Sequence, residues 1–182
     1  MRGFTLVEVI IATAILALMS SIGLPSLLEI LDRHQSSSSV AEFRRILVGA
    51  RNIALNNRQK VTVCPFNNNQ CSNNWQNPIT AFVDLNSNQK IDANEVQLIT
   101  ASNERNSGNW IARSGSSNKV LFNEQGHAFG SATTFLYCPS SGDNKHARQL
   151  VISFQGRIRS DYYLSRRGTP FASLNGFACP ES

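Results

Sequence analysis

The first 31 residues constrain the fold of this chain more than any other part of it. After Arg2 and Gly3, an apolar run continues to residue 28 and is broken only by Glu8, so that residues 9–28 are 20 consecutive uncharged residues. As an α-helix with a rise of about 1.5 Å per residue, that stretch would span roughly 30 Å, the thickness of the hydrocarbon core of a bilayer. A run of this length predicts either a signal that is removed or an anchor that is retained.

The construction of this segment favours a retained anchor. A secretory signal peptide has an apolar centre of about 7–15 residues and then a small-residue cleavage site. Here the run is longer, and its end carries Gly23, Pro25 and Ser26, which would break or kink a helix. An ionisable group inside such a run is unfavourable without a partner, so Glu8 indicates a functional site.

Residues 2–8, with the sequence RGFTLVE, resemble the class III signal of type IV prepilins and of type II secretion pseudopilins. The resemblance implies that a prepilin peptidase cleaves between Gly3 and Phe4, that the new amino terminus of Phe4 is N-methylated, and that Glu8 is needed for assembly. In a filament, the Glu8 carboxylate could neutralise the Phe4 amine of a neighbouring subunit. The alternative is an uncleaved signal anchor with Glu8 near the membrane interface.

Length, charge and cysteine content bound the rest of the chain. The 182 residues leave room for one anchor helix and one compact domain of about 125 residues. A net charge of +5 is mild but favours anionic partners. The four cysteines and the membrane-targeting start indicate an oxidising, extracytoplasmic compartment. We therefore predict four segments: a leader (1–3), a transmembrane or filament-core helix (4–31), an amphipathic helix half (32–57) and a globular β-rich domain (58–182).

An amphipathic helix is expected over residues 29–57. Its apolar stripe recurs at spacings of three and four and consists of Val40, Phe43, Leu47, Ala50 and Ala54. The basic residues of the segment fall elsewhere and predict a solvated face: Arg44, Arg45, Arg51 and Arg58. The four serines at 36–39 are poor helix formers and predict a looser segment near the membrane exit.

The remainder predicts short strands separated by Asn-rich turns. The strand candidates are residues 59–63, 79–85, 96–101, 119–122, 134–138, 149–154 and 157–163. One long helix followed by mainly antiparallel strands is an α+β arrangement, in which the helix packs on a β-sheet domain as in type IV pilins.

Four stretches of the globular part narrow the resemblance. They are ARNIALNNRQKVTVCP, AFVDLNSNQKIDANEVQLI, FNEQGHAFG and LVISFQGRIR, and they resemble FimT/FimU-type minor pilins and their GspH-type relatives in type II secretion. The resemblance implies a subunit of low abundance, placed at or near the filament tip.

The four cysteines allow three disulfide connectivities. We favour Cys64–Cys71, because neighbours in sequence meet most often, which leaves Cys138–Cys179 to tie the C-terminal tail to a strand. In the loop-entropy description, the short loop closed by Cys64–Cys71 would stabilise the fold by roughly 2–3 kcal/mol, and the longer loop closed by Cys138–Cys179 by roughly 4 kcal/mol. A zinc site is the alternative, but the chain has no CxxC pair and its three histidines are scattered.

Residues 84–95 match the spacing of a calcium loop. Side-chain oxygens fall at positions 1, 3, 5, 9 and 12 of the loop, from Asp84, Asn86, Asn88, Asp92 and Glu95. Position 6, normally glycine, is Gln89, and strand-like segments replace the usual helix pair. A polar hairpin loop without metal explains the same residues.

A basic motif near the C-terminus points to nucleic acid. In an extended segment, Arg157 and Arg159 lie on one face about 7 Å apart, with Ile158 on the other face. Guanidinium groups suit bidentate phosphate contacts. The GRxR sequence resembles the DNA-binding element of competence-associated FimT-type pilins, which implies non-specific DNA binding and uptake. Further candidates for this patch are Lys145, Arg148, Arg166 and Arg167. Alternatively, the arginines only solvate an edge strand.

No enzymatic motif is present: the chain lacks GxSxG, HExxH and a phosphate-cradling glycine loop. Together with the resemblance to FimT/FimU-type pilins, this predicts a minor pilin with no catalytic residues, cofactor or metal, whose partners are other pilins, the prepilin peptidase and DNA. Its expected location is the inner membrane before assembly and the pilus at the cell surface afterwards. The alternatives are a purely structural minor pilin and a GspH-type pseudopilin of type II secretion.

Overall fold

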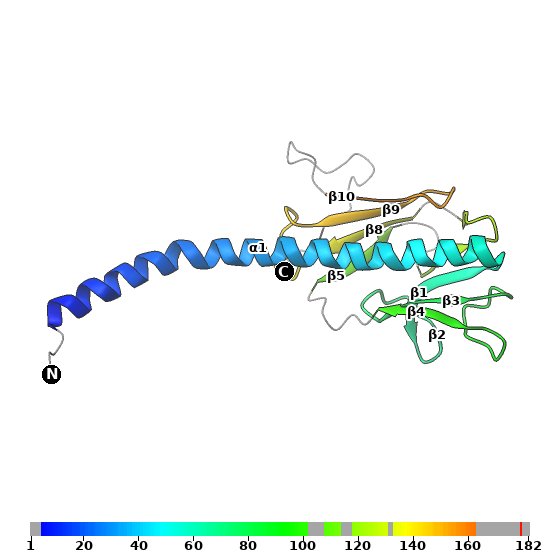
Figure 1. The fold of residues 1–182 in the computed structure, drawn as a ribbon, viewed down its shortest axis with the longest axis horizontal. Coiled ribbons are helices and arrows are strands. Elements are labelled where there is room, and N and C mark those ends of the chain that lie inside the picture. The colour runs from blue at the N-terminus through cyan, green and yellow to red at the C-terminus, as the bar shows by residue number, and fades with distance from the viewer. Residues whose placement is uncertain (1–4, 102–107, 114–117, 131–132, 163–178, 180–182) are drawn as a thin grey trace.

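In the part of the chain that the structure describes, one long helix and two antiparallel sheets make up the fold (Figure 1). The computed structural model describes residues 5–101, 108–113, 118–130, 133–162 and 179, and only the backbone of residues 21–25, Phe129 and Tyr162. The first half of the helix projects away from the sheets, and its second half lies along them (Figure 1). This architecture confirms the predicted α+β class.

Helix α1 (Leu6–Asn57) is 52 residues long. It begins after Thr5, whose side chain accepts a hydrogen bond from the Glu8 amide at 3.3 Å, and it ends where Arg58 adopts a left-handed conformation with φ 51°. The helix is not broken at Gly23 or Pro25, although its projecting half is curved (Figure 1).

The looser segment predicted at the four serines is wrong. The helix is continuous through residues 36–39, and Ser36 and Ser39 are buried. Their small side chains allow the helix backbone to approach the domain closely, so tertiary packing overrides their weak helix propensity.

The projecting half of α1 carries large apolar side chains that are exposed in this structure. They include Leu6, Val7, Ile10, Leu16, Leu18 and Met19. Within the described part of the chain, no helix has a stretch long and apolar enough to cross a membrane.

Two sheets contain all the described strands, and every strand pair is antiparallel. The first sheet has the order β4-β3-β1-β6-β7, with β2 paired to β1, and the second has the order β10-β9-β8-β5. The bounds are β1 (Val61–Asn67), β2 (Gln70–Cys71), β3 (Ile79–Val83), β4 (Gln97–Ala101), β5 (Asn109–Arg113), β6 (Val120–Phe122), β7 (Ala128–Phe129), β8 (Thr133–Cys138), β9 (Arg148–Ile152) and β10 (Ile158–Tyr162).

Each of the seven predicted strands corresponds to an observed strand, whereas β2, β5 and β7 were not predicted. Strands β2 and β7 have two residues each, too few for a periodic pattern. Strand β5, with the sequence NWIAR, does not alternate cleanly and is defined by its pairing along the whole of β8. Long-range pairing, which local sequence does not report, defines these strands.

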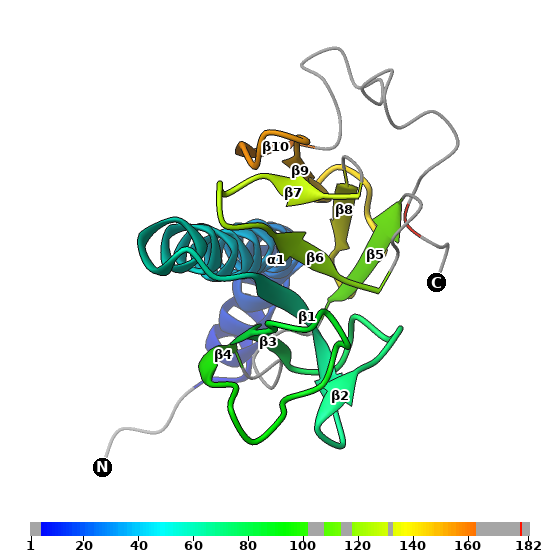
Figure 2. The ribbon, with the colours of Figure 1, turned by 90° about the vertical axis from the view of Figure 1, so that its right-hand side faces the viewer.

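The core lies between α1 and the two sheets. Figure 2 shows α1 end-on, with β9 and β10 on one side of it and β1, β3 and β4 on the other. The predicted helical stripe is fully buried, as its regular spacing required. At its centre, the Phe43 ring makes edge-on contacts with Trp110 and Phe135, each with ring centroids 4.9 Å apart.

The structure contains the two disulfides that were favoured. Cys64–Cys71 closes the β1–β2 hairpin, and Cys138–Cys179 joins the end of β8 to the C-terminal region. The second bond lies in a small apolar cluster with Leu136 on the side of the second sheet that faces away from the main core.

Candidate nucleic-acid interface

The GRxR motif lies in the hairpin formed by β9 and β10. Strand β10 is at the edge of the second sheet, with Ile158 opposite Ile152 and Arg159 opposite Val151. Arg157 immediately precedes the strand, and its carbonyl still accepts a hydrogen bond from the Ser153 amide at 2.9 Å. The motif is therefore held in an extended conformation on one side of the hairpin.

The side chains of the motif alternate between the two faces of this edge strand. Ile158 packs against the main hydrophobic core, whereas Arg157 and Arg159 are exposed. Since successive side chains of a strand point to opposite faces, the side chains of Arg157 and Arg159 leave the backbone on the face turned away from α1, at positions about 7 Å apart along the strand. Neither forms an ion pair with any of the residues that the structure describes.

A tight turn positions the first arginine. The Gly156 amide donates to the Ser153 carbonyl at 2.8 Å, and the Arg157 amide donates to the Ser153 hydroxyl at 3.2 Å. Gly156 has φ +75°, and a Cβ at this position would lie 2.0 Å from the Gly126 carbonyl oxygen. The glycine of the motif is thus required by the left-handed conformation and by close backbone packing.

Arg51 of α1 holds this turn against the turn between β6 and β7. Its Nε donates to the Gly126 carbonyl at 2.9 Å, and its Nη2 donates to the Gln155 carbonyl at 3.2 Å. The assignment of Arg51 to a purely solvated face was therefore wrong, although Arg44 and Arg45 are exposed as predicted. The helical period cannot report contacts to turns that are 75 and 104 residues away in sequence.

Two of the other predicted basic residues, Lys145 and Arg148, lie apart from Arg157 and Arg159. Lys145 pairs with Glu29 of α1 and precedes β9. Arg148 begins β9 opposite Tyr162, at the other end of the hairpin from the motif. Arg166 and Arg167 lie outside the described residues.

The strand register places one further basic residue, Arg113, on the same face of the sheet as Arg159, and the sequence did not indicate this. Arg159 is opposite Val151, Val151 is opposite Thr134, and Thr134 is opposite Arg113, so these four residues share one face of the sheet. Arg113 is exposed and lies about 14 Å from Arg159 across three strand spacings. Asp161 is exposed on the same face, two residues after Arg159, and reduces the local positive charge.

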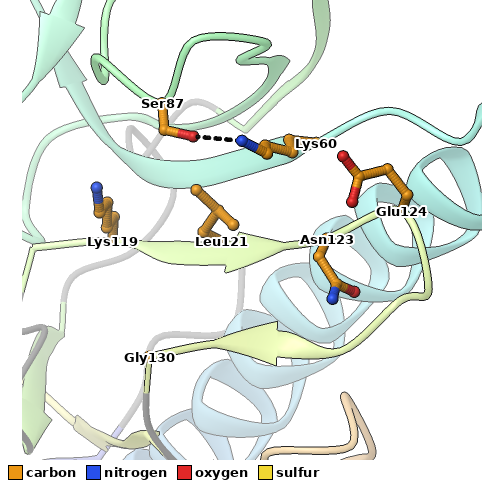
Figure 3. A pocket seen from close by; sticks show the side chains of 7 residues that line it. All are labelled: Lys60, Ser87, Lys119, Leu121, Asn123, Glu124 and Gly130. Carbon is orange, nitrogen blue, oxygen red and sulfur yellow. Dashed lines mark hydrogen bonds between the residues drawn. The ribbon is translucent and has the colours of Figure 1, made fainter.

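A separate cavity of about 350 Å³ lies beside the first sheet (Figure 3). It is lined by Lys60, Ser87, Lys119, Leu121, Asn123, Glu124 and Gly130. Lys60 donates to the Ser87 hydroxyl at 3.4 Å, and the two lysines flank Leu121 (Figure 3). The sequence did not indicate this cavity, because its lining comes from four separate segments.

Comparisons with known proteins agree with this fold. Residues 39–156, well over half of the chain, match the family described as Type II transport protein GspH, and residues 1–24 match the prokaryotic N-terminal methylation motif. Two crystal structures of the type IV minor pilin FimU of Pseudomonas aeruginosa are similar at 21% identity. For the first structure the TM-score is 0.59, and the match covers 72% of this chain and 92% of the FimU chain. For the second the TM-score is 0.52, and the match covers 69% of this chain and 91% of the FimU chain. No curated protein matches.

Proposed function

Because the chain belongs to the GspH family, we propose that it is a minor type IV pilin, a structural subunit at or near the tip of a filament. The methylation motif at residues 1–24 supports processing after Gly3 and N-methylation of Phe4 by a prepilin peptidase. Residues 4–31 would anchor the subunit in the inner membrane before assembly and form part of the filament core afterwards. The globular domain would remain extracytoplasmic and face other pilins.

The projecting half of α1 supports this role. Large apolar side chains are exposed there, and burying them between subunits would be favourable at about 25 cal/mol per Å². Glu8 is exposed in the same half and has no ion-pair partner among the described residues. In a filament it would pair with the amine of Phe4 on a neighbouring subunit, which offsets the loss of hydration of both charges.

We further propose that the subunit binds DNA without sequence preference and contributes to DNA uptake. The observation that carries this proposal is the pair of exposed guanidinium groups of Arg157 and Arg159, which share one face of an edge strand without a carboxylate partner in the described structure. Their spacing suits neighbouring phosphates, and Arg113 extends the same face across the sheet.

A gel-shift experiment with the full chain in detergent tests DNA binding. Replacing Arg157 and Arg159 by alanine should abolish the shift at about 0.15 M salt. Any residual binding should show a log–log salt slope that is smaller by about 1.8, because two phosphate contacts are lost. Arg44 and Arg45 are exposed on α1, so their double replacement by alanine removes the same charge elsewhere and should leave the shift intact. Equal binding by both double variants would exclude this interface.

The second candidate is a GspH-type pseudopilin of type II secretion, favoured by the description of the matching family as a type II transport protein. Deleting the gene discriminates between the two roles. A minor pilin predicts loss of pili, which a chain with Glu8→Ala should not restore, whereas a pseudopilin predicts a secretion defect with normal pili. A structural minor pilin that does not bind DNA would show the pilus defect and no gel shift.

A further inference from the structure

The connection between β3 and β4 folds back on itself through its acidic side chains. The Glu95 carboxylate accepts from the Leu85 amide at 2.9 Å and from the Asp92 amide at 3.1 Å. Asp92 Oδ2 accepts from the side-chain amides of Asn86 at 2.9 Å and Asn88 at 2.7 Å. Residues at positions 1–5 of the loop are thereby joined to those at positions 9 and 12.

The backbone makes the sharp turn that the absent glycine had placed in doubt. Gln89, at position 6, adopts a left-handed conformation with φ 66°, and Ser87 does so with φ 62°. The Gln89 side chain accepts a hydrogen bond from Asn118 at 3.1 Å, which helps to hold this conformation. A non-glycine residue in this conformation is energetically unfavourable and persists only where its surroundings hold it.

Independent evidence for a ligand comes from the residue at position 1. Asp84 is fully buried, and its Oδ2 accepts from the Thr62 hydroxyl at 2.7 Å and from the Gln89 amide at 3.3 Å. Its Oδ1 is buried and has no hydrogen-bond partner in the described structure. Because the Gln89 amide reaches this carboxylate from the loop, the carboxylate is directed into the loop. A buried carboxylate oxygen without a donor is unfavourable, and a bound cation would satisfy it.

The charge around the loop also favours a cation. Three carboxylates lie in 12 residues, from Asp84, Asp92 and Glu95, and no ion pair with a described residue neutralises them. The nearby basic groups are Lys60, whose ammonium contacts the Ser87 hydroxyl, Lys119, which lines the same cavity as Ser87, and the exposed Lys90.

The three carboxylates of the loop do not converge on one point in this structure. Among the residues described, no three His, Cys, Asp or Glu side chains are gathered closely enough to hold one. Instead, the side-chain NH₂ groups of Asn86 and Asn88 donate hydrogen bonds to the Asp92 carboxylate and partly compensate its negative charge. A cation would replace these donors and draw the three carboxylates together.

From these observations we propose that residues 84–95 bind one Ca²⁺ ion. The ligands are the side-chain oxygens of Asp84, Asn86, Asn88, Asp92 and Glu95. All are hard oxygen donors, and such a set of side chains from one irregular loop suits the variable coordination of Ca²⁺ better than the strict octahedron of Mg²⁺. The loop is bonded to the β1–β2 hairpin, since the Cys71 amide donates to the Gln89 carbonyl at 2.9 Å. Calcium would therefore order this end of the first sheet.

Calorimetry and thermal unfolding of the full chain in detergent, after removal of metal by a chelator, test the proposal. One Ca²⁺ should bind with a dissociation constant of about 10⁻⁴–10⁻³ M, the range of extracellular modules. The unfolding temperature should rise with Ca²⁺ and change much less with equal Mg²⁺. Glu95→Gln keeps an oxygen that can accept from the Leu85 amide but removes a charged ligand, and should weaken binding at least tenfold. Glu124→Gln removes the same charge outside the loop and is the matched control.

Three results would overturn the site. The first is no heat of binding and no change in unfolding temperature at 10 mM Ca²⁺, which is on the order of ten times the expected dissociation constant. The others are an equal response to Mg²⁺ and unchanged Ca²⁺ binding by the Glu95→Gln chain. If the metal-free Glu95→Gln chain unfolds at a much lower temperature than the natural chain, Asp92→Asn replaces it as the deciding variant. Asp92 is exposed, and asparagine retains one acceptor for the two amides. Tenfold weaker binding is again expected, and unchanged binding would again refute the site.

Discussion

Replacing Gly156 by alanine should destabilise the protein by about 2.5–5 kcal/mol, the sum of two contributions. About 1–2 kcal/mol comes from placing an L-residue at φ +75°. The added Cβ would also lie 2.0 Å from the Gly126 carbonyl oxygen, so the two turns must separate by about 1 Å or more. That movement lengthens the 2.9 Å hydrogen bond from Arg51 Nε to Gly126, and losing a bond from a charged donor costs about 1.5–3 kcal/mol.

Urea unfolding of the full chain in detergent measures this loss. The only two tryptophans, Trp75 and Trp110, are both buried, so their fluorescence reports the loss of the core. Gly142→Ala is the matched control, because Gly142 has φ +72° in the turn before β9 and should lose only the conformational 1–2 kcal/mol. If Gly156→Ala lowers the free energy of unfolding no more than Gly142→Ala does, the contact with Gly126 does not constrain the turn.

Two further changes probe the core and its crosslinks. Replacing Cys138 and Cys179 by serine should lower the free energy of unfolding by about 4 kcal/mol, whereas replacing Cys64 and Cys71 should lower it by about 2–3 kcal/mol. The difference arises because the Cys138–Cys179 bond closes the longer loop. Equal losses in urea unfolding would contradict this. Burial raises the pKa of Tyr137, so the stability that its neutral phenol contributes is complete below pH 10 and should be lost as the pH rises through the raised value. Alkaline unfolding curves of the natural chain and of Tyr137→Phe check this, and an identical pH dependence of the two would refute it.

Most of the fold could be predicted from local patterns. The stripe through Phe43 and Leu47 has helical period, and all of it is buried. The seven predicted strands alternate or are β-branched, and each is observed. The prediction failed where long-range contacts decide: Ser36 and Ser39 are helical because they pack against the domain, and β5 is a strand because it pairs with β8.

The candidate interface was predictable only in part. Alternation along an extended segment placed Arg157 and Arg159 on one face and Ile158 on the other, as observed. It could not indicate Arg113, which reaches the same face only through the register of four strands. Nor could this alternation predict that Lys145 lies apart from the motif, because Lys145 pairs with Glu29, which is 116 residues away in sequence.

The sequence by itself therefore determined the long helix, the class of the fold and the motif around Glu8, because these depend on residue type and on short periodic spacing. The tertiary structure alone decided how the two turns meet and how the acidic loop is bent. Arg51 joins Gly126 to Gln155, and Gln89 makes a turn normally made by glycine. Both depend on contacts between segments distant in the chain, and no local pattern of residues encodes such contacts.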